Sequence, residues 1–319
     1  MQILGNKILV KPEKYKEKTD SGIYLPDAIL GDKLCGEVIL VGKKDMQVKV
    51  GQKVYYDTYS GHPFEYKGED MLIMSQYECF CADDKPISNY VKIKMERKAD
   101  EYIMKDGKKL FIDPTYQVGK HASVVGTVIG VPDKLRFVWN KSIFAEEGSM
   151  EWETDMELEV GDTVWYSFVA LSNSLGRLMD EGAKHNNKKY IVEGGEVYVF
   201  IPYDQIFVAK RKDKVICLNG YLLIEPIFDE KIESKLLELP NSMQPSKSKK
   251  YGKVAYMGSC CRNHLGYSVV DADGFDVGDT VVFDRFWNLP LEYDIHRSFD
   301  GNKEFYRVQR RGVNAIIKL

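Results

Sequence analysis

The side chains with the greatest capacity for chemistry in this sequence are its cysteines and histidines, and their spacing argues against a metal site. The six cysteines form no Cys-x-x-Cys pair, and the five histidines lie far apart along the chain. Structural zinc sites use closely spaced cysteine or histidine ligands. The irregular spacing is typical of reduced thiols in an intracellular protein. We therefore expect neither a metal nor another cofactor.

The sequence also lacks the motifs of common enzyme classes. It contains no G-x-S-x-G elbow, no P-loop, no H-E-x-x-H and no G-x-G-x-x-G. A zinc-dependent dehydrogenase would need a Gly-His-Glu ligand set and a nucleotide-binding domain, and Gly61-His62-Pro63 lacks the glutamate. We therefore expect that the chain is not an enzyme.

The chemistry that the sequence does offer is apolar binding from a loop tip. Ile23-Tyr24-Leu25 is enclosed by Gly22 and Pro26. Apolar side chains at a loop tip cannot be buried against their own domain, so they favour an apolar groove on another protein. In the alternative interpretation, Ile23 and Leu25 form a strand that faces the core.

A second apolar tip precedes a proline far along the chain. Its residues are Leu236, Leu237 and Leu239, before Pro240, and the polar tract 241–250 follows. Such a tract has little capacity for packing. We therefore expect two loops, residues 15–33 and 234–250, to be mobile in the free protein.

Composition limits the possible partners. The chain has 319 residues, of which 44% are hydrophobic and 29% charged, enough for two or three domains with their own cores. The net charge of −3 gives no global basic field for nucleic acid or for a membrane surface. No apolar run is long enough to span a bilayer, and no segment directs secretion. We expect a cytoplasmic protein that binds neither nucleic acid nor membrane.

A pattern that occurs three times predicts the elements that position these loops. Each copy has a first strand that ends at proline, a second that opens with glycine, a third that follows a V-G-x-x-V turn, and a closing pair of strands. The markers are Pro12, Gly36 and Gly51 in the first copy, Pro114, Gly126 and Gly161 in the second, and Pro226, Gly252 and Gly278 in the third. Short strands punctuated by turns are typical of small β-barrels or sandwiches.

The spacing of these markers predicts three domains, residues 1–88, 89–213 and 214–319. Twenty-four residues separate proline from glycine in the first copy, 12 in the second and 26 in the third. The middle copy should therefore have a shortened loop and the third a long polar loop. The middle copy also has insertions, of which 133–159 predicts an extra hairpin and 171–187 a short helix.

The first 83 residues resemble a chaperonin-10 (GroES-type) subunit. The matching elements are Lys7–Lys11, the charged run Glu13–Lys18, Gly22-Ile23-Tyr24-Leu25, Gly36-Glu37-Val38, Val48–Val54, Asp57–Asp70 and Leu72–Ser75. The second and third copies resemble the family through the repeated pattern alone and are more divergent. The resemblance implies an all-β chain of three tandem, partly open GroES-like barrels.

The resemblance also implies a function. Proteins of this family form a ring that caps a GroEL-type chaperonin, and a flexible loop places an apolar triplet in a groove between two helices of the chaperonin. The matching residues are Ile23, Tyr24 and Leu25. Leu236, Leu237 and Leu239 would form a possible second loop tip. The expected protein is a co-chaperonin that assists folding and associates with itself.

The threefold pattern does not determine the symmetry of the assembly. A chaperonin ring of seven subunits matches seven separate loops, and seven is not divisible by three. Seven chains can assemble through the first copy, or the ring can have another symmetry. A third interpretation keeps the barrel only for oligomerisation, in a structural ring or collar such as that of a virus particle. The protein would then be virion-associated and would not bind a chaperonin.

Overall fold

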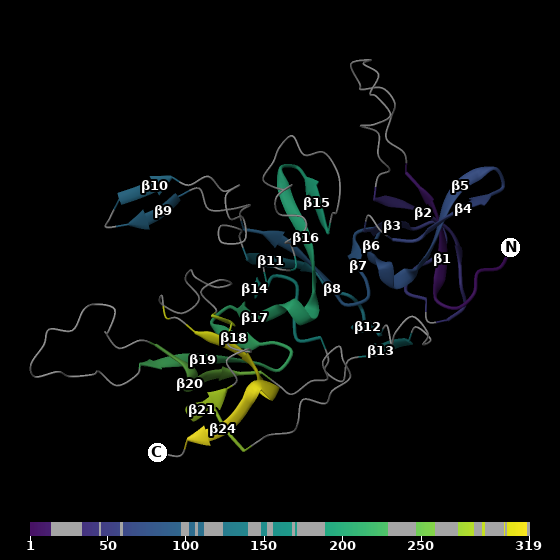
Figure 1. Ribbon diagram of the computed structural model, residues 1–319. Coiled ribbons are helices and arrows are strands. Elements are labelled where there is room, and N and C mark those ends of the chain that lie inside the picture. Colours follow the sequence, from purple (N-terminus) through teal and green to yellow (C-terminus); the bar gives the residue numbers. More distant parts are fainter. Residues whose placement is uncertain are drawn as a thin grey trace, which may run out of the picture. The chain divides into compact units, whose positions relative to one another are not determined.

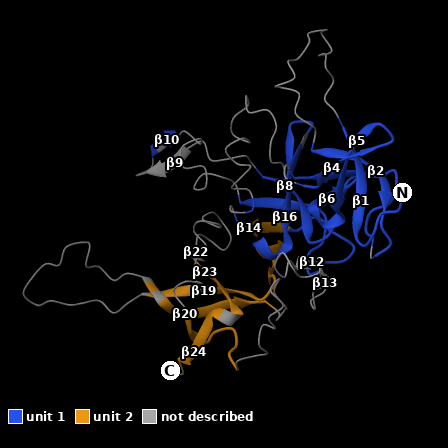
Figure 2. Cartoon of the chain, turned by 45° about the vertical axis from the view of Figure 1, so that its right-hand side comes forward, with its two compact units in different colours: residues 1–162, 167–205 blue, residues 163–166, 206–319 orange. Residues whose placement is uncertain are grey.

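The computed structural model describes residues 1–13, 34–44, 46–57, 60–96, 102–105, 108–111, 124–139, 148–151, 156–167, 170, 189–228, 247–258, 274–283, 289–290, 303 and 305–317. These residues fall into two compact units, 1–162 with 167–205 and 163–166 with 206–319 (Figure 2). Their regular structure consists of antiparallel strands and single 3-10 turns, which confirms the predicted all-β class. Among them, no helix is long and apolar enough to cross a membrane.

The first sheet is built from the first 86 residues and has the strand order β4-β5-β1-β2-β3-β6-β7 (Figure 1). Its strands are β1 (Lys7–Pro12), β2 (Cys35–Val41), β3 (Lys53–Tyr56), β4 (His62–Tyr66), β5 (Glu69–Ser75), β6 (Cys79–Ala82) and β7 (Lys85–Pro86). The 3-10 turn Gln76–Glu78 carries a capping box, in which Ser75 and Glu78 satisfy backbone N–H groups reciprocally. The sheet is open, with β4 and β7 at its edges.

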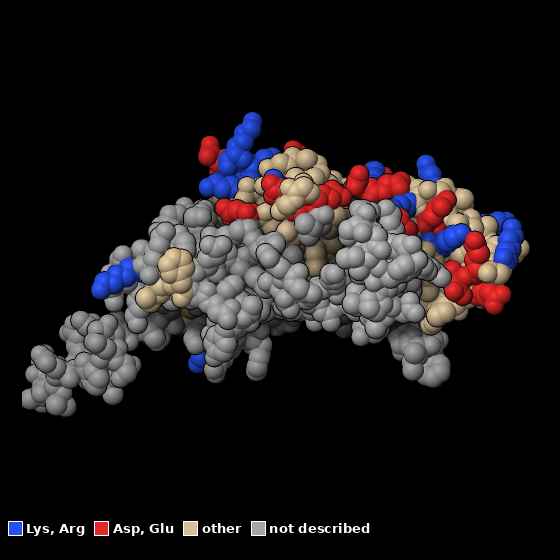
Figure 3. All heavy atoms as spheres, turned by 90° about the horizontal axis from the view of Figure 1, so that it is seen from above, with Lys and Arg blue, Asp and Glu red and all other residues tan. Residues whose placement is uncertain are grey.

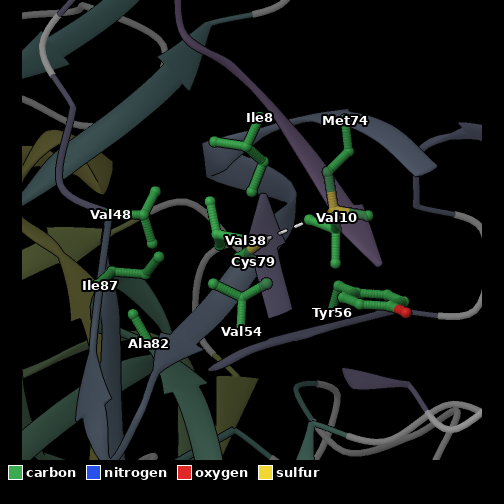
Figure 4. Packing of buried hydrophobic residues seen from close by; sticks show 10 residues of the cluster. All are labelled: Ile8, Val10, Val38, Val48, Val54, Tyr56, Met74, Cys79, Ala82 and Ile87. Atoms are coloured by element: carbon green, nitrogen blue, oxygen red, sulfur yellow. Dashed lines mark hydrogen bonds between the residues drawn. The ribbon is translucent and has the colours of Figure 1, made fainter. Parts of the chain in front are cut away.

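One face of this sheet carries the first core (Figure 4). Alternate residues of each strand point inward, as the period of a strand requires. The buried side chains are Ile8, Val10, Val38, Val48, Val54, Tyr56, Met74, Cys79, Ala82 and Ile87. The Cys79 thiol donates to the Met74 sulfur at 3.7 Å, and burial raises the pKa of this thiol.

The second cysteine of β6 is also held as a thiol. Burial raises the pKa of Cys81 to about 12, and its Sγ donates to the Asp83 carbonyl at 3.0 Å. A thiolate is the reactive form of cysteine, so at neutral pH this residue acts as a small apolar side chain.

Unit 1 also contains the strand order β15-β16-β8-β11, formed by β8 (Tyr90–Met95), β11 (Val125–Gly130), β15 (Tyr190–Glu193) and β16 (Glu196–Pro202). The pairing corrects the predicted first strand of the second copy. β8 pairs with β11 and β16, just as β1 pairs with β2 and β5. The residues before Pro114 were therefore the wrong choice, because Met95 occupies the position that proline holds in the other copies.

Two hairpins complete the described part of unit 1. Residues that precede Pro114 in the sequence form β10 (Lys108–Phe111), which pairs with β9 (Tyr102–Lys105). The insertion 133–159 forms β12 (Arg136–Trp139) and β13 (Gly148–Glu151), which confirms the predicted extra hairpin. The predicted helix within 171–187 lies outside the described residues.

Unit 2 contains the order β14-β17-β18, formed by β14 (Thr163–Tyr166), β17 (Ile206–Arg211) and β18 (Lys214–Cys217). A further sheet has the order β22-β23-β19-β20-β21-β24. Its strands are β19 (Tyr221–Phe228), β20 (Lys247–Met257), β21 (Thr280–Phe283), β22 (Leu289–Pro290), β23 (Tyr306–Gln309) and β24 (Val313–Ile317). Its core gathers Leu222, Ile224, Val254, Phe275, Val281, Phe283, Tyr306 and Val308.

The V-G-x-x-V turns have the same geometry in all three copies. Gly51, Gly161 and Gly278 have φ of 86°, 99° and 103°, a region that favours glycine. Each donates its N–H to the carbonyl of the buried valine of the second strand, Val38, Val128 or Val254. These recurring bonds are compatible with two further copies of the first fold.

Candidate functional site

The predicted loop tips themselves lie outside the described residues, so their geometry stays a prediction. These are Ile23, Tyr24 and Leu25 in the first loop, and Leu236, Leu237 and Leu239 in the second. The structure describes the strands to which both loops are attached. Residues 247–250, at the end of the second segment that is predicted to be mobile, begin β20.

The root of the first loop is fixed where β1 leaves the sheet and β2 returns. Pro12 lies opposite Gly36, and the Glu13 N–H donates to the Cys35 carbonyl at 2.9 Å. The Glu13 carboxylate also lies 2.6 Å from Lys53 Nζ on β3. The hydrogen bond to Glu13 raises the pKa of Lys53. The two ends of the loop are therefore held next to each other by the pairing of β1 with β2.

Gly36 is required at this root because the backbone of β1 passes too close for a side chain. A Cβ atom on Gly36 would lie 2.4 Å from the Lys11 carbonyl oxygen and 2.6 Å from a methyl group of Val10. Gly126 and Gly252 are similarly constrained. A Cβ atom added to Gly126 would lie 2.4 Å from the Lys94 carbonyl oxygen, and one added to Gly252 would lie 2.6 Å from the Glu225 carbonyl oxygen. The marker glycine of each second strand is thus a close-approach residue, although Gly252 lies inside β20 and does not open it.

We expect the substitution Gly36→Ala to loosen the root of the first loop. The new methyl group would press against a backbone oxygen, which cannot move without breaking hydrogen bonds of the sheet. We expect the free energy of unfolding to fall by about 3 kcal/mol. Amide exchange in peptides from β1 and β2 should then accelerate by about a hundredfold. Gly68→Ala is the matched control: nothing lies within 4 Å of its Cβ, and its φ of 77° predicts only about 1 kcal/mol of backbone strain. Equal acceleration in both variants would contradict this role for Gly36.

Corresponding roots occur in the other two copies, and they revise the expected loop lengths. Met95 lies opposite Gly126, and Pro226 opposite Gly252, as Pro12 lies opposite Gly36. The two residues of each pair are 24 positions apart in the first copy, 31 in the second and 26 in the third. The spacing from Pro114 to Gly126 predicts a shortened loop in the middle copy. From the observed root, its loop is the longest of the three.

The middle loop also carries apolar residues that the sequence reasoning did not select as a site. Leu110 and Phe111 on β10 are 43% and 81% exposed. The first strand that the sequence predicts before Pro114 includes both residues, since an apolar run before proline fits a paired strand or an exposed hairpin. The signal that distinguishes the roles is the register of β8 with β11, which only the structure provides.

Charged side chains near these roots form local ion pairs. Lys11 lies 2.7 Å from Glu69, and Lys94, at the corresponding position of the second copy, lies 2.9 Å from Glu196. In the view of Figure 3, basic and acidic side chains occur together on the described surface. Within the described residues, no group of three or more His, Cys, Asp and Glu side chains could hold a metal ion.

Comparison with known proteins identifies the first sheet. Residues 1–82 match the family model described as chaperonin 10 Kd subunit. A protein named co-chaperonin GroES from Chloroherpeton thalassium is 40% identical over 86 residues, which cover 24% of this chain and 90% of the relative. Proteins of the same name from Rickettsia bellii and Porphyromonas gingivalis are 35% and 43% identical over 86 and 77 residues, and 90% and 86% of their lengths are covered.

The matched region ends where β6 ends, so it contains β1 to β6 and the root of the first loop. The remaining strands, with their recurring register, are compatible with additional copies of this sheet. Through its first 82 residues, the chain belongs to the chaperonin 10 kDa subunit family, the family of the GroES co-chaperonins.

Proposed function

We propose that this chain is a co-chaperonin that associates into a ring, caps a GroEL-type chaperonin through apolar loops and assists protein folding. The observation that carries the proposal is the anchored loop root between β1 and β2, in the segment that matches co-chaperonin GroES. Ile23, Tyr24 and Leu25 on that loop would enter an apolar groove of the chaperonin. The proposal includes domains at 1–88, 89–213 and 214–319, and a cytoplasmic location.

The energetics favour binding through several loops at once. Burial of one large apolar side chain contributes about 1.5–3 kcal/mol. Ordering a loop offsets several kcal/mol of this gain, so one loop alone binds weakly. Loops held on one ring share a high effective concentration, which gives strong but reversible capture. In this proposal, Leu236, Leu237 and Leu239, and the exposed Leu110 and Phe111, supply further contacts from each chain.

A second candidate function is a structural ring or collar, for instance in a virus particle. It is favoured by the packing of Phe80 on β6 against Phe200 on β16, with ring centroids 4.8 Å apart. This contact joins the first sheet to strands of the second copy. In this alternative, the GroES-like barrel serves oligomerisation and does not bind a chaperonin.

The two candidates are distinguished by the native mass of the purified chain, measured alone and after mixing with a GroEL-type chaperonin and nucleotide. The co-chaperonin proposal expects a complex that forms only with nucleotide. A chain that forms a stable ring but stays apart from the chaperonin under every nucleotide condition would overturn it and favour the structural ring.

A further inference from the structure

Three corresponding strands, β4, β15 and β22, lie at the edges of their sheets in the described part of the chain. They pair with β5, β16 and β23, and these three neighbours align through their own pairing with β1, β8 and β19. At one aligned position, opposite Leu72, Val199 and Tyr306, the edge strands have Pro63, Tyr190 and Pro290. The middle copy therefore differs from the other two at its edge.

The β15–β16 hairpin fixes the direction of the backbone groups on this edge (Figure 1). Its two-residue turn, Gly194-Gly195, has φ of 59° and 84°, as a type I′ turn requires. The pair of residues that flanks such a turn is hydrogen-bonded, and hydrogen-bonded pairs then alternate with pairs that are not. The Phe200 N–H donates to the Lys189 carbonyl at 2.7 Å, in phase with this alternation. The backbone groups of Tyr190 and Val192 therefore point away from β16.

The two prolines lie where an added strand would need a donor. In the first copy, the turn Lys67-Gly68 has φ of 56° and 77°, so the alternation has the same phase and the backbone of Pro63 faces the edge. Pro290 has the corresponding position in the third copy. Proline has no N–H, and its presence on an edge strand prevents the addition of another strand. Tyr190 has the N–H that both prolines lack, so β15 has the backbone of an edge that can be extended.

The side chains on one face of β15 are arranged symmetrically in charge. Residues two apart on a strand share a face, so Lys189, Ile191 and Glu193 lie together. Ile191 packs against the buried cluster that contains Phe80, and the Lys189 Nζ lies 5.3 Å from the centroid of the Tyr90 ring, which packs against the same cluster. Glu193 is exposed. A cation and an anion thus flank one isoleucine at equal spacing.

This arrangement is complementary to itself. When a second β15 is placed antiparallel to the first and centred on Ile191, the edge-facing backbone of Tyr190 lies opposite that of Val192, as a hydrogen-bonded pair requires. In the same register Lys189 lies opposite Glu193 on both sides of the centre, and opposite charges in such pairs are favourable. A register displaced by two residues places a charged side chain opposite Ile191 instead.

We propose that β15 of one chain pairs antiparallel with β15 of a second copy of this chain, about a two-fold axis at Ile191. The occupant is a second copy because the edge is complementary in charge to itself in the register that its backbone allows. Pairing about a two-fold axis closes on itself, so this contact joins chains two at a time. It goes beyond the proposed function, since it uses neither the apolar loops nor the chaperonin.

Sedimentation velocity of the full chain over a range of concentrations, without chaperonin, tests this contact. Tyr190→Pro gives β15 the proline of the other two edges and removes one donor from each side of the axis. It should weaken self-association by about tenfold or more. The N–H of residue 190 points away from β16, so the hairpin itself loses no hydrogen bond. Tyr190→Val is the matched control, because it removes the ring but keeps the N–H, and it should leave self-association unchanged.

A charge swap tests the register. Glu193→Lys places a lysine opposite Lys189 on both sides of the axis, and it should weaken self-association by about tenfold. The double variant Lys189→Glu/Glu193→Lys restores opposite charges in both pairs, so its self-association should return to that of the unsubstituted chain. Such rescue is specific to the register that is centred on Ile191.

The outcomes separate this proposal from the proposed function. Self-association that persists unchanged in Tyr190→Pro and Glu193→Lys, in variants that circular dichroism shows to be folded, overturns the β15 contact and leaves a ring through other contacts standing. A charge swap without rescue also overturns the two-fold register. An unsubstituted chain that stays monomeric at every concentration overturns both the β15 contact and the ring. Chaperonin capture is measured separately and is not a readout here.

Discussion

The double substitution Ile23→Ser/Leu25→Ser should abolish capture of a GroEL-type chaperonin while leaving the fold intact. Each side chain would lose about 1.5–3 kcal/mol of apolar burial, so one loop should bind at least a hundredfold more weakly. The loss repeats in every loop of a ring, and capture by several loops fails when each contact weakens. Retention of the chain on immobilised chaperonin in the presence of nucleotide measures the effect.

A matched control lies in the same loop. The double substitution Ile29→Ser/Leu30→Ser also removes one isoleucine and one leucine, but outside the triplet, and we expect retention close to that of the unsubstituted chain. Both variants should show the same amide exchange in β1 and β2 as the unsubstituted chain, because the root bonds of Glu13 and Gly36 are unaffected. Full retention of the triplet variant would show that the triplet is not the contact.

The second large effect is expected for Phe80→Ala. Phe80, the extra residue of a β-bulge opposite β3, is 2% exposed and packs against Tyr90 and Phe200, so its truncation leaves a cavity. Truncation of a buried phenylalanine costs about 3–5 kcal/mol. We expect amide exchange to accelerate by more than a hundredfold in peptides from β6, β8 and β16, all of which lie in unit 1.

Phe64→Ala is the control for this prediction. Phe64 lies on the edge strand β4 and is 40% exposed, so its truncation should cost less than about 1 kcal/mol. Exchange in β6, β8 and β16 should stay close to that of the unsubstituted chain. Peptides of β16 that remain fully protected in Phe80→Ala would contradict a stabilising role for this packing.

Several features of the fold could be predicted from local sequence. The V-G-x-x-V turns were placed correctly, because a positive φ is a property of a single glycine and needs no distant partner. The strands that contain Gly36 and Gly126 were also placed correctly, since a glycine at a strand entry followed by alternating apolar residues is a local signal. The third strand was expected to open at Gly252, but β20 begins earlier, at Lys247. The family resemblance of the first 82 residues rests on such local patterns.

The first strand of the second copy could not be predicted in this way. Tyr90–Met95 and Leu110–Phe111 are both short apolar runs with strong strand propensity, and the proline after the second run favoured the wrong one. The choice depends on which run pairs with β11 and β16. These two strands lie up to about a hundred positions further along the chain. Pairing over such distances is decided by packing and not by propensity.

By itself, the sequence determined the all-β class, the recurring turns, the extra hairpin and the family of the first sheet. The tertiary structure alone decided which apolar run forms the first strand of the second copy, and which residues, Phe80 and Phe207, are the extra residues of bulges opposite β3 and β14. The physical reason is that a bulge is a relation between two strands. A single residue acquires that role only when its partner strand fixes the register.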